Sequence, residues 1–222
     1  MYSKIFEQMA SQADQEKAQQ MAAYLKNQFF FFGLSRPVRN QLQKDFLQEA
    51  KGRKLLDWGF IDECWERPQR ECQYLAMDYL IALQRELTEH DLKKVEKLIV
   101  AKSWWDTVDI LASNLVGALA QKYPHLVTDS ILPWAVDENI WLQRTAILFQ
   151  LKYKGKTDSA VLAEIIGQTK DTNEFFLNKA IGWALREFSK TDPLWVGDFL
   201  NNTQLSKLSR REAGKYITGR PE

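Results

Sequence analysis

A repeat of about 35 residues is the feature that most restricts the folds open to this chain. Four positions, each near the start of a predicted helix, follow one another at spacings of 35, 36 and 35 residues: Arg70, Trp105, Trp141 and Phe176. An apolar residue lies near the same place in each unit: Leu80, Leu115, Leu151 and Leu185. Between short connectors, apolar residues recur three or four positions apart, which predicts amphipathic helices and no strands. Each unit is therefore long enough for a pair of helices.

Helix pairs of this period are typical of solenoids, in which each pair buries its apolar face against the next. The residues characteristic of TPR repeats are not evident, so we predict an all-α, HEAT-like repeat solenoid of paired antiparallel helices. We expect it to form a single domain over residues 1–222. Such stacks are curved, and the second helix of each pair usually lines the concave face. Functional residues are therefore expected on the second helices.

The composition agrees with a folded protein that does not enter a membrane. Hydrophobic residues make up 45% of the 222 positions, enough for a substantial core. No apolar run is long enough to span a bilayer, and the N-terminus lacks the apolar core of a signal peptide, so we expect a soluble cytoplasmic protein. Cys64 and Cys72 have no His partner at metal-binding spacing. Neither a zinc site nor a disulfide framework is expected.

Charge is distributed unevenly along the chain. The formal net charge is +1, but Lys and Arg minus Asp and Glu gives −3 for residues 1–140 and +4 for residues 141–222. A basic C-terminal third is suited to following a phosphate backbone. It is equally compatible with ordinary solvated surface, and the asymmetry alone favours that simpler interpretation.

The segment from Ser103 to Asp109 brings two indoles and two carboxylates together at the start of one helix. Ser103 and Asp106 have the spacing of a capping box, which would explain Asp106 without any function. Asp109 follows Trp105 by one helical turn, so the two side chains share a face beside an apolar row. A carboxylate at the edge of the core is costly unless it is used, which makes Asp109 a candidate functional residue.

Arg144 interrupts an apolar row on its own predicted helix. Its neighbours at helical spacing are Ile140, Ile147 and Leu151, so the cation requires an anion. That anion is either Asp109 of the preceding repeat or a phosphate of a bound ligand. A buried ion pair would explain both charges without catalysis, and a functional pair remains equally open.

Aromatic and basic residues alternate in the C-terminal third. Trp183 follows Phe176 and Ala180 at helical spacing, as core aromatics usually do, but its neighbours include Lys179 and Arg186. Aromatic side chains interleaved with cations form surfaces on which bases or cationic rings stack. Three alternating lysines follow the Arg144 helix and would lie at one edge of the same face: Lys152, Lys154 and Lys156. Such lysines are usually only solvated.

Taken together, three motifs closely resemble the AlkD-type DNA alkylation repair family. They are Ser103-Trp104-Trp105-Asp106-Thr107-Val108-Asp109, Trp141-Leu142-Gln143-Arg144-Thr145-Ala146 and Asn178-Lys179-Ala180-Ile181-Gly182-Trp183-Ala184-Leu185-Arg186. The segment Phe32-Gly33-Leu34-Ser35-Arg36-Pro37 also looks like an early element of that family. The resemblance covers essentially the whole chain, in order, and the combination is specific where each motif alone would be weak.

The resemblance implies a DNA glycosylase that excises cationic N3- and N7-alkylated purines, such as 3-methyladenine and 7-methylguanine, from duplex DNA during base excision repair, without metal or cofactor. It makes Asp109 the catalytic carboxylate and Arg144 the cation near that carboxylate and the backbone phosphate. Trp105 and Trp183 would contact the lesion-bearing nucleotide, and Tyr24 matches a further aromatic of the cleft. We also expect Arg144 to lower the pKa of Asp109.

The remaining predicted contacts and alternatives follow from the same residues. The expected contacts to the DNA backbone are Lys152, Lys154, Lys156, Lys179 and Arg186. Double-stranded DNA is the expected partner of a monomer in the bacterial cytoplasm, associated with the nucleoid when it acts. One alternative is a non-catalytic HEAT-like module that binds branched or damaged DNA, and a second is a protein-binding scaffold. The run Phe29 to Phe32 is either a packed helix end or a small exposed patch.

Overall fold

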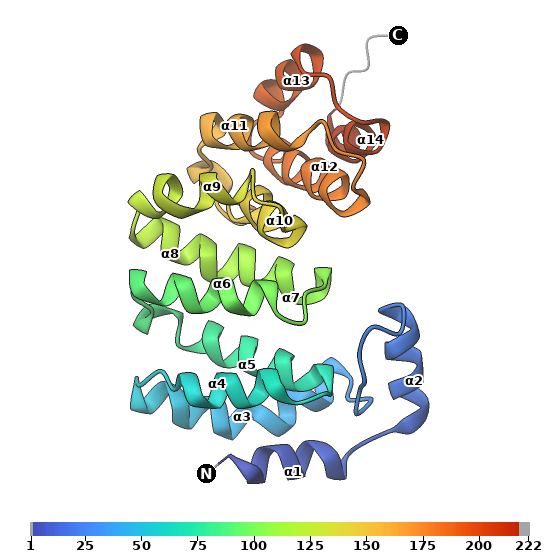
Figure 1. Cartoon of the computed structure of the whole chain (residues 1–222), viewed down its shortest axis with the longest axis vertical. Helices are drawn as coiled ribbons and strands as arrows, with labels where there is room; N and C mark the ends of the chain where they lie inside the picture. The colour runs from blue at the N-terminus through green and yellow to red at the C-terminus, as the bar shows by residue number, and fades with distance from the viewer. Residues whose placement is uncertain (1, 218–222) are drawn as a thin grey trace. The chain divides into compact units, whose positions relative to one another are not determined.

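The computed structural model of this chain describes residues 2–217, and this part of the chain is helical throughout apart from its connectors (Figure 1). No strand occurs in residues 2–217, where a single isolated bridge joins Phe30 and Gln69. The predicted all-α architecture is confirmed. Contacts divide the chain into two compact units, one extending to Leu87 and the other starting at Thr88. No helix in the described range is long and apolar enough to cross a membrane.

The first unit contains five α-helices and a short 3₁₀ turn among its described residues. They are α1 (Ser3–Ser11), α2 (Gln15–Tyr24), α3 (Arg36–Arg53), α4 (Trp58–Glu66), α5 (Arg70–Ala82) and η1 (Gln84–Glu86). The helix α5 packs on both α3 and α4, and these three helices lie side by side in Figure 1. In contrast, α2 buries none of its residues. The core of this unit therefore lies between α1, α3, α4 and α5.

The segment before α3 turns around a buried carboxylate. Glu71, at the start of α5, accepts hydrogen bonds from the backbone N–H groups of Phe32, Gly33 and Leu34 at 2.9 to 3.0 Å. Gly33 has φ of +90°, and a Cβ there would lie 2.1 Å from the carbonyl oxygen of Asp14. Glycine is thus required at this position by both backbone conformation and space.

The four consecutive phenylalanines, Phe29 to Phe32, do not share one environment. Phe29 lies under the guanidinium of the fully buried Arg70, with 3.7 Å between Arg70 Cζ and the ring centroid. Phe30 is 74% exposed. Phe29 therefore packs within the first unit and Phe30 lies on its surface, and both belong to the connector between α2 and α3 rather than to a helix end.

The second unit carries the predicted site. Its elements are η2 (Glu89–Asp91), α6 (Leu92–Val100), α7 (Trp105–Ile110), η3 (Leu111–Val116), α8 (Gly117–Lys122), η4 (Val127–Ile131), α9 (Leu132–Trp134), α10 (Ile140–Leu148), η5 (Lys154–Lys156), α11 (Ser159–Thr169), α12 (Phe175–Ser189), α13 (Pro193–Asn202), α14 (Lys207–Ala213) and η6 (Gly214–Tyr216). The helices that begin at the repeat positions pack in sequence, α10 against α7 and α12 against α10, and α14 continues the row by packing against α12. This is the stacking that the 35-residue spacing predicts.

The capping box predicted for Ser103 and Asp106 is wrong, although another one forms in this unit. Thr88 and Asp91 form a capping box at the start of η2. Ser103 does not cap α7, because its hydroxyl donates to the carbonyl oxygen of Ile99 at the end of α6 (2.7 Å) and Trp104 occupies the N-cap position. Asp106 lies in the first turn of α7, where a negative charge is favourable beside the positive end of the helix.

Candidate functional site

The centre of the site is an ion pair between neighbouring repeats. Arg144 of α10 donates from Nε to Asp109 Oδ1 at 2.7 Å and from Nη2 to Asp109 Oδ2 at 2.9 Å. Its third nitrogen, Nη1, donates to the carbonyl oxygen of Phe176 at the start of α12. The Arg144 side chain is 5% exposed and that of Asp109 is 12% exposed. Arg144 therefore joins three successive repeats, and the carboxylate keeps a small opening to solvent.

Two opposing influences act on the Asp109 carboxyl group. Burial raises its pKa and is the larger influence, whereas the hydrogen bonds and positive charge of Arg144 lower the pKa. The pKa of Asp109 is consequently above its ordinary value. The predicted effect of Arg144 on this pKa is confirmed, and burial, which sequence periodicity does not reveal, outweighs it.

A π-helical turn begins two residues after Asp109. In η3, the Ser113 hydroxyl donates to the backbone carbonyl of Asp109 (2.7 Å), and the Asn114 amide donates to that of Ile110 (2.9 Å). The helix continues through α8 without a break, so residues 105–122 form one rod with a local expansion. Such turns occur frequently at functional sites. Sequence periodicity did not predict this one.

Three aromatic rings pack together at the starts of α7, α10 and α12, and the ring of Phe176 lies 6.0 Å from Arg144 Cζ. We define this aromatic cluster as Trp104, Trp141 and Phe176, whose ring centroids lie 5.1 to 5.7 Å apart. Trp141 and Phe176 occupy the aligned repeat positions. Trp104 was not predicted to have a role, and its indole N–H is buried without a hydrogen-bond partner. The cluster fixes the ends of the three helices that supply Asp109, Arg144 and the Phe176 carbonyl.

The two predicted lesion-contacting indoles lie on different helices. Trp105 is the first residue of α7, one turn before Asp109, and is partly exposed. Trp183 is partly exposed on α12, seven residues beyond Phe176 and thus about 10 Å further along the helix axis. Trp105 therefore belongs to the immediate surroundings of Asp109, and Trp183 lies two turns further along α12.

The predicted lysines after α10 are exposed, and one of them has a defined partner. Lys152 donates from Nζ to Asn114 Oδ1 at 2.6 Å, and partial desolvation of its ammonium group in this contact lowers its pKa. Lys154 and Lys156 lie in the short turn η5. An open cavity of about 470 Å³ adjoins this segment, and its lining includes Lys152, Lys154, Glu187 and Lys190. Lys152 thus links the segment after α10 to the π-helical turn beyond Asp109.

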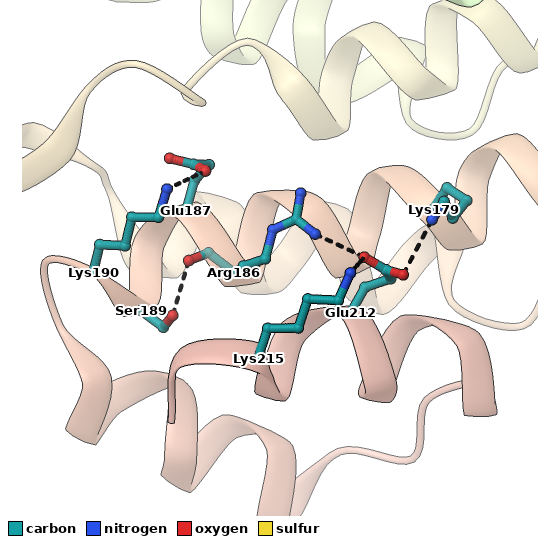
Figure 2. A network of polar contacts seen from close by, with 7 residues as sticks. All are labelled: Lys179, Arg186, Glu187, Ser189, Lys190, Glu212 and Lys215. Carbon is teal, nitrogen blue, oxygen red and sulfur yellow. Dashed lines mark hydrogen bonds and ion pairs between the residues drawn. The ribbon is translucent and has the colours of Figure 1, made fainter. Parts of the chain in front are cut away.

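The other two predicted cations share an acidic partner on α14. Lys179 and Arg186 both bind Glu212, at 3.1 and 2.7 Å (Figure 2).

Tyr24, the remaining predicted contact, belongs to the first unit, where it ends α2 and is 71% exposed. No group of three His, Cys, Asp or Glu side chains among residues 2–217 is placed to hold a metal ion.

Comparison with known proteins gives a consistent result. The sequence matches the DNA alkylation repair enzyme family over residues 5–217. A solved structure described as a predicted DNA alkylation repair enzyme from Enterococcus faecalis is 31% identical, with 94% of this chain and 98% of that chain covered and a TM-score of 0.86. The protein smu.31 from Streptococcus mutans is 21% identical, with 81% and 97% covered and a TM-score of 0.58, which shows a shared fold alone. No curated protein matches the sequence.

Proposed function

Because the chain belongs to the DNA alkylation repair enzyme family, we propose that it is a glycosylase that removes cationic N3- and N7-alkylated purines, such as 3-methyladenine and 7-methylguanine, from duplex DNA. The observation that carries this proposal is the Asp109 carboxylate, held in place by two hydrogen bonds from Arg144 yet still 12% exposed. A carboxylate fixed in this way is preorganised to meet a positive charge that develops beside it.

The chemistry of the substrate explains why one carboxylate suffices. An alkylated purine already carries a positive charge, so it leaves with the electron pair of the C1′–N bond and becomes neutral without protonation by the protein. The sugar then acquires oxocarbenium character, which Asp109 stabilises. Water adds to C1′ and releases a proton to solvent. Asp109 either positions that water or acts through its charge alone.

Selectivity for the lesion follows from its charge. Indole faces attract cations, with about 0.5 to 2 kcal/mol for each contact. Trp105 and Trp183 therefore favour a cationic nucleotide over a neutral one, and the exposed Tyr24 of the first unit is proposed as a separate DNA contact. The lysines after α10, together with Lys179 and Arg186, hold the phosphate backbone.

The protein acts on DNA as a monomer in the bacterial cytoplasm, without a metal or cofactor.

The competing function is a DNA-binding module without catalysis. The observation that favours it is the geometry of the ion pair itself, since Arg144 donates to both oxygens of Asp109 and a buried ion pair of this kind needs no substrate. A protein-binding scaffold is the third possibility. It predicts no affinity for DNA.

The decisive experiment measures release of 3-methyladenine and 7-methylguanine from methylated duplex DNA under single-turnover conditions. We expect release by the wild-type protein and a loss of about 100- to 1000-fold in Asp109→Asn, the usual cost of removing one preorganised electrostatic group. Asp106→Asn removes a neighbouring carboxylate from the same helix and should retain activity within a few-fold. Because Asp109→Asn leaves Arg144 with a neutral partner, its folding is verified by thermal unfolding and duplex binding. DNA binding without release by the wild type would establish the non-catalytic module instead.

A further inference from the structure

Glu212 on α14 collects three cations around one buried carboxylate. Its side chain is 7% exposed and accepts hydrogen bonds from Lys179, Arg186 and Lys215 at 2.7 to 3.1 Å (Figure 2). Lys179 and Arg186 come from α12, and Lys215 comes from the turn η6 that follows α14. We call these four residues the Glu212 cluster.

The cluster holds more positive charge than its carboxylate can neutralise. Three cations face a single Glu212, so the group carries a formal charge of +2. The cations remain open to solvent, with 39% of the Lys179 side chain exposed, 22% of Arg186 and 48% of Lys215. An ammonium group has three N–H donors and a guanidinium has five. Most of these donors are not used by Glu212, and an anion on the outer side of the cluster can accept them.

The cluster lies on the same helical stripe as a predicted site residue. Lys179, Trp183 and Arg186 are separated by four and three positions, so the indole lies between the two cations along α12. The helical turn of α12 that contains Gly182 also packs closely against α14, because a Cβ on Gly182 would lie 2.5 Å from Glu212 Cβ. An anion bound by the cluster would therefore lie next to Trp183.

We propose that Glu212 is a positioning residue for DNA binding, which holds Lys179, Arg186 and Lys215 as one preorganised cation cluster for a backbone phosphate next to Trp183. The inference rests on the proposed function. Long cationic side chains lose rotamer freedom when they bind a ligand, and a partner that orders them beforehand removes part of that cost. The phosphodiester fits because it is an anion with several acceptor oxygens and needs no pocket.

Glu212→Gln separates positioning from charge, because the two effects have opposite signs. The substitution removes a negative charge, so electrostatics alone predicts tighter binding to DNA. If Glu212 positions the cations, binding becomes weaker in spite of the added positive charge. We expect the Kd for an unmodified duplex, measured by fluorescence anisotropy at several salt concentrations, to rise about 5- to 10-fold, roughly 1 kcal/mol or slightly more by the relation between Kd and free energy.

Glu187→Gln is the matched control. Glu187 lies on the same helix and pairs with a single lysine, Lys190, at 2.6 Å (Figure 2). The control loses the same charge without disturbing the cluster, so it should bind DNA as tightly as the wild type or more tightly. The Glu212→Gln variant should need a higher protein concentration to saturate the DNA. Once the DNA is saturated, the rate of base release should approach that of the wild type, since the substitution leaves the chemical step intact.

Lys215→Met provides a second test that leaves the fold intact, because the side chain is half exposed and Lys179 and Arg186 keep Glu212. It should lower the slope of log K against log salt by about 1, as expected for one lost phosphate contact. The inference is overturned if Glu212→Gln binds as tightly as Glu187→Gln, or if Lys215→Met leaves both affinity and slope unchanged. A wild-type protein that does not bind DNA would instead remove the proposed function and the inference with it.

Discussion

At the scale of single residues, the protonation state of Asp109 sets a testable limit on activity. The carboxylate must be ionised to stabilise a positive charge, and its pKa is raised because burial outweighs Arg144. The single-turnover rate should therefore fall on acidification at a higher pH than for an ordinary aspartate, whose pKa is about 3.9. Arg144→Met removes the influence that lowers the pKa. The acidic limb of its pH–rate profile should move upward by about 1 to 3 pH units.

The control for this prediction is Arg144→Lys, which keeps a positive charge but loses the two-point geometry. Its acidic limb should lie between those of the wild type and Arg144→Met. An acidic limb at the same pH in all three proteins would show that Asp109 ionisation does not limit the reaction. Duplex binding is measured in parallel, so that a change in affinity is not mistaken for a change in protonation.

The residues of this pair could be identified from sequence, but their surroundings could not. A cation in an apolar row requires an anion, and sequence offered two candidates, Asp109 of the preceding repeat and a ligand phosphate; the structure shows the pair with Asp109. The capping role assigned to Ser103 was wrong, because spacing does not show that its hydroxyl ends α6. Trp104 became the N-cap of α7 because its ring packs against Trp141 and Phe176 from later repeats. Such long-range packing leaves no local pattern.

At the scale of helices, the close approach of α14 to α12 depends on a missing side chain. A Cβ at Gly182 would lie 2.5 Å from Glu212 Cβ and 2.9 Å from the backbone carbonyl oxygen of Ser209. Gly182→Ala must therefore push the two helices apart, at a cost of about 1 to 3 kcal/mol of unfolding free energy. Gly167→Ala on α11 meets nothing within 4 Å and should stabilise by about 0.5 to 1 kcal/mol through helix propensity. Chemical denaturation of both variants checks this, and equal stabilisation by both would contradict the packing.

The same helix contact should respond to acid. The hydrogen bond from Lys215, followed by that from Lys179, lowers the pKa of Glu212 to about 2, against an ordinary value of 4.5. A carboxyl group with a depressed pKa stabilises the fold above its unfolded pKa, and this contribution is lost as the pH falls from about 4.5 towards 2. The difference in Tm between the wild type and Glu212→Gln should therefore shrink over that interval. A Tm difference that is constant with pH would show that Glu212 stabilises only through packing.

Helix order and pairing could be predicted because they follow from periodicity and spacing, but departures from the regular helix could not. The π-helical turn at η3 begins only two residues after Asp109. The apolar residues Leu111 and Leu115 keep ordinary helical spacing through this turn. The hydroxyl of Ser113 and the amide of Asn114 satisfy backbone carbonyls in this turn, and such polar residues in a helix interior are ambiguous signals. Local sequence therefore does not reveal how close this turn lies to the site.

At the scale of the whole molecule, the excess of positive charge lies in the C-terminal third of the chain. Residues 141–222 carry a net charge of +4, and every cation assigned to the DNA backbone falls in this range. Sequence alone could not distinguish a phosphate-binding surface from ordinary solvated lysines. Folding adds one distinction, because Lys179, Arg186 and Lys215 converge on one carboxylate whereas Lys154 and Lys156 remain exposed on a short turn. These two groups of cations should therefore contribute to binding in different ways.

Lys154 and Lys156 test whether the local arrangement or the total charge determines affinity. Each phosphate contact contributes about 0.9 to the slope of log K against log salt for duplex DNA. The double variant Lys154→Gln/Lys156→Gln should therefore lower that slope by about 1 to 2 and weaken binding at moderate salt. Lys93→Gln/Lys97→Gln on α6 removes the same charge from exposed positions that we do not assign to DNA and should leave the slope close to that of the wild type. Equal losses in both double variants would mean that DNA responds only to net charge, and the assignment of η5 to the binding surface would then be wrong.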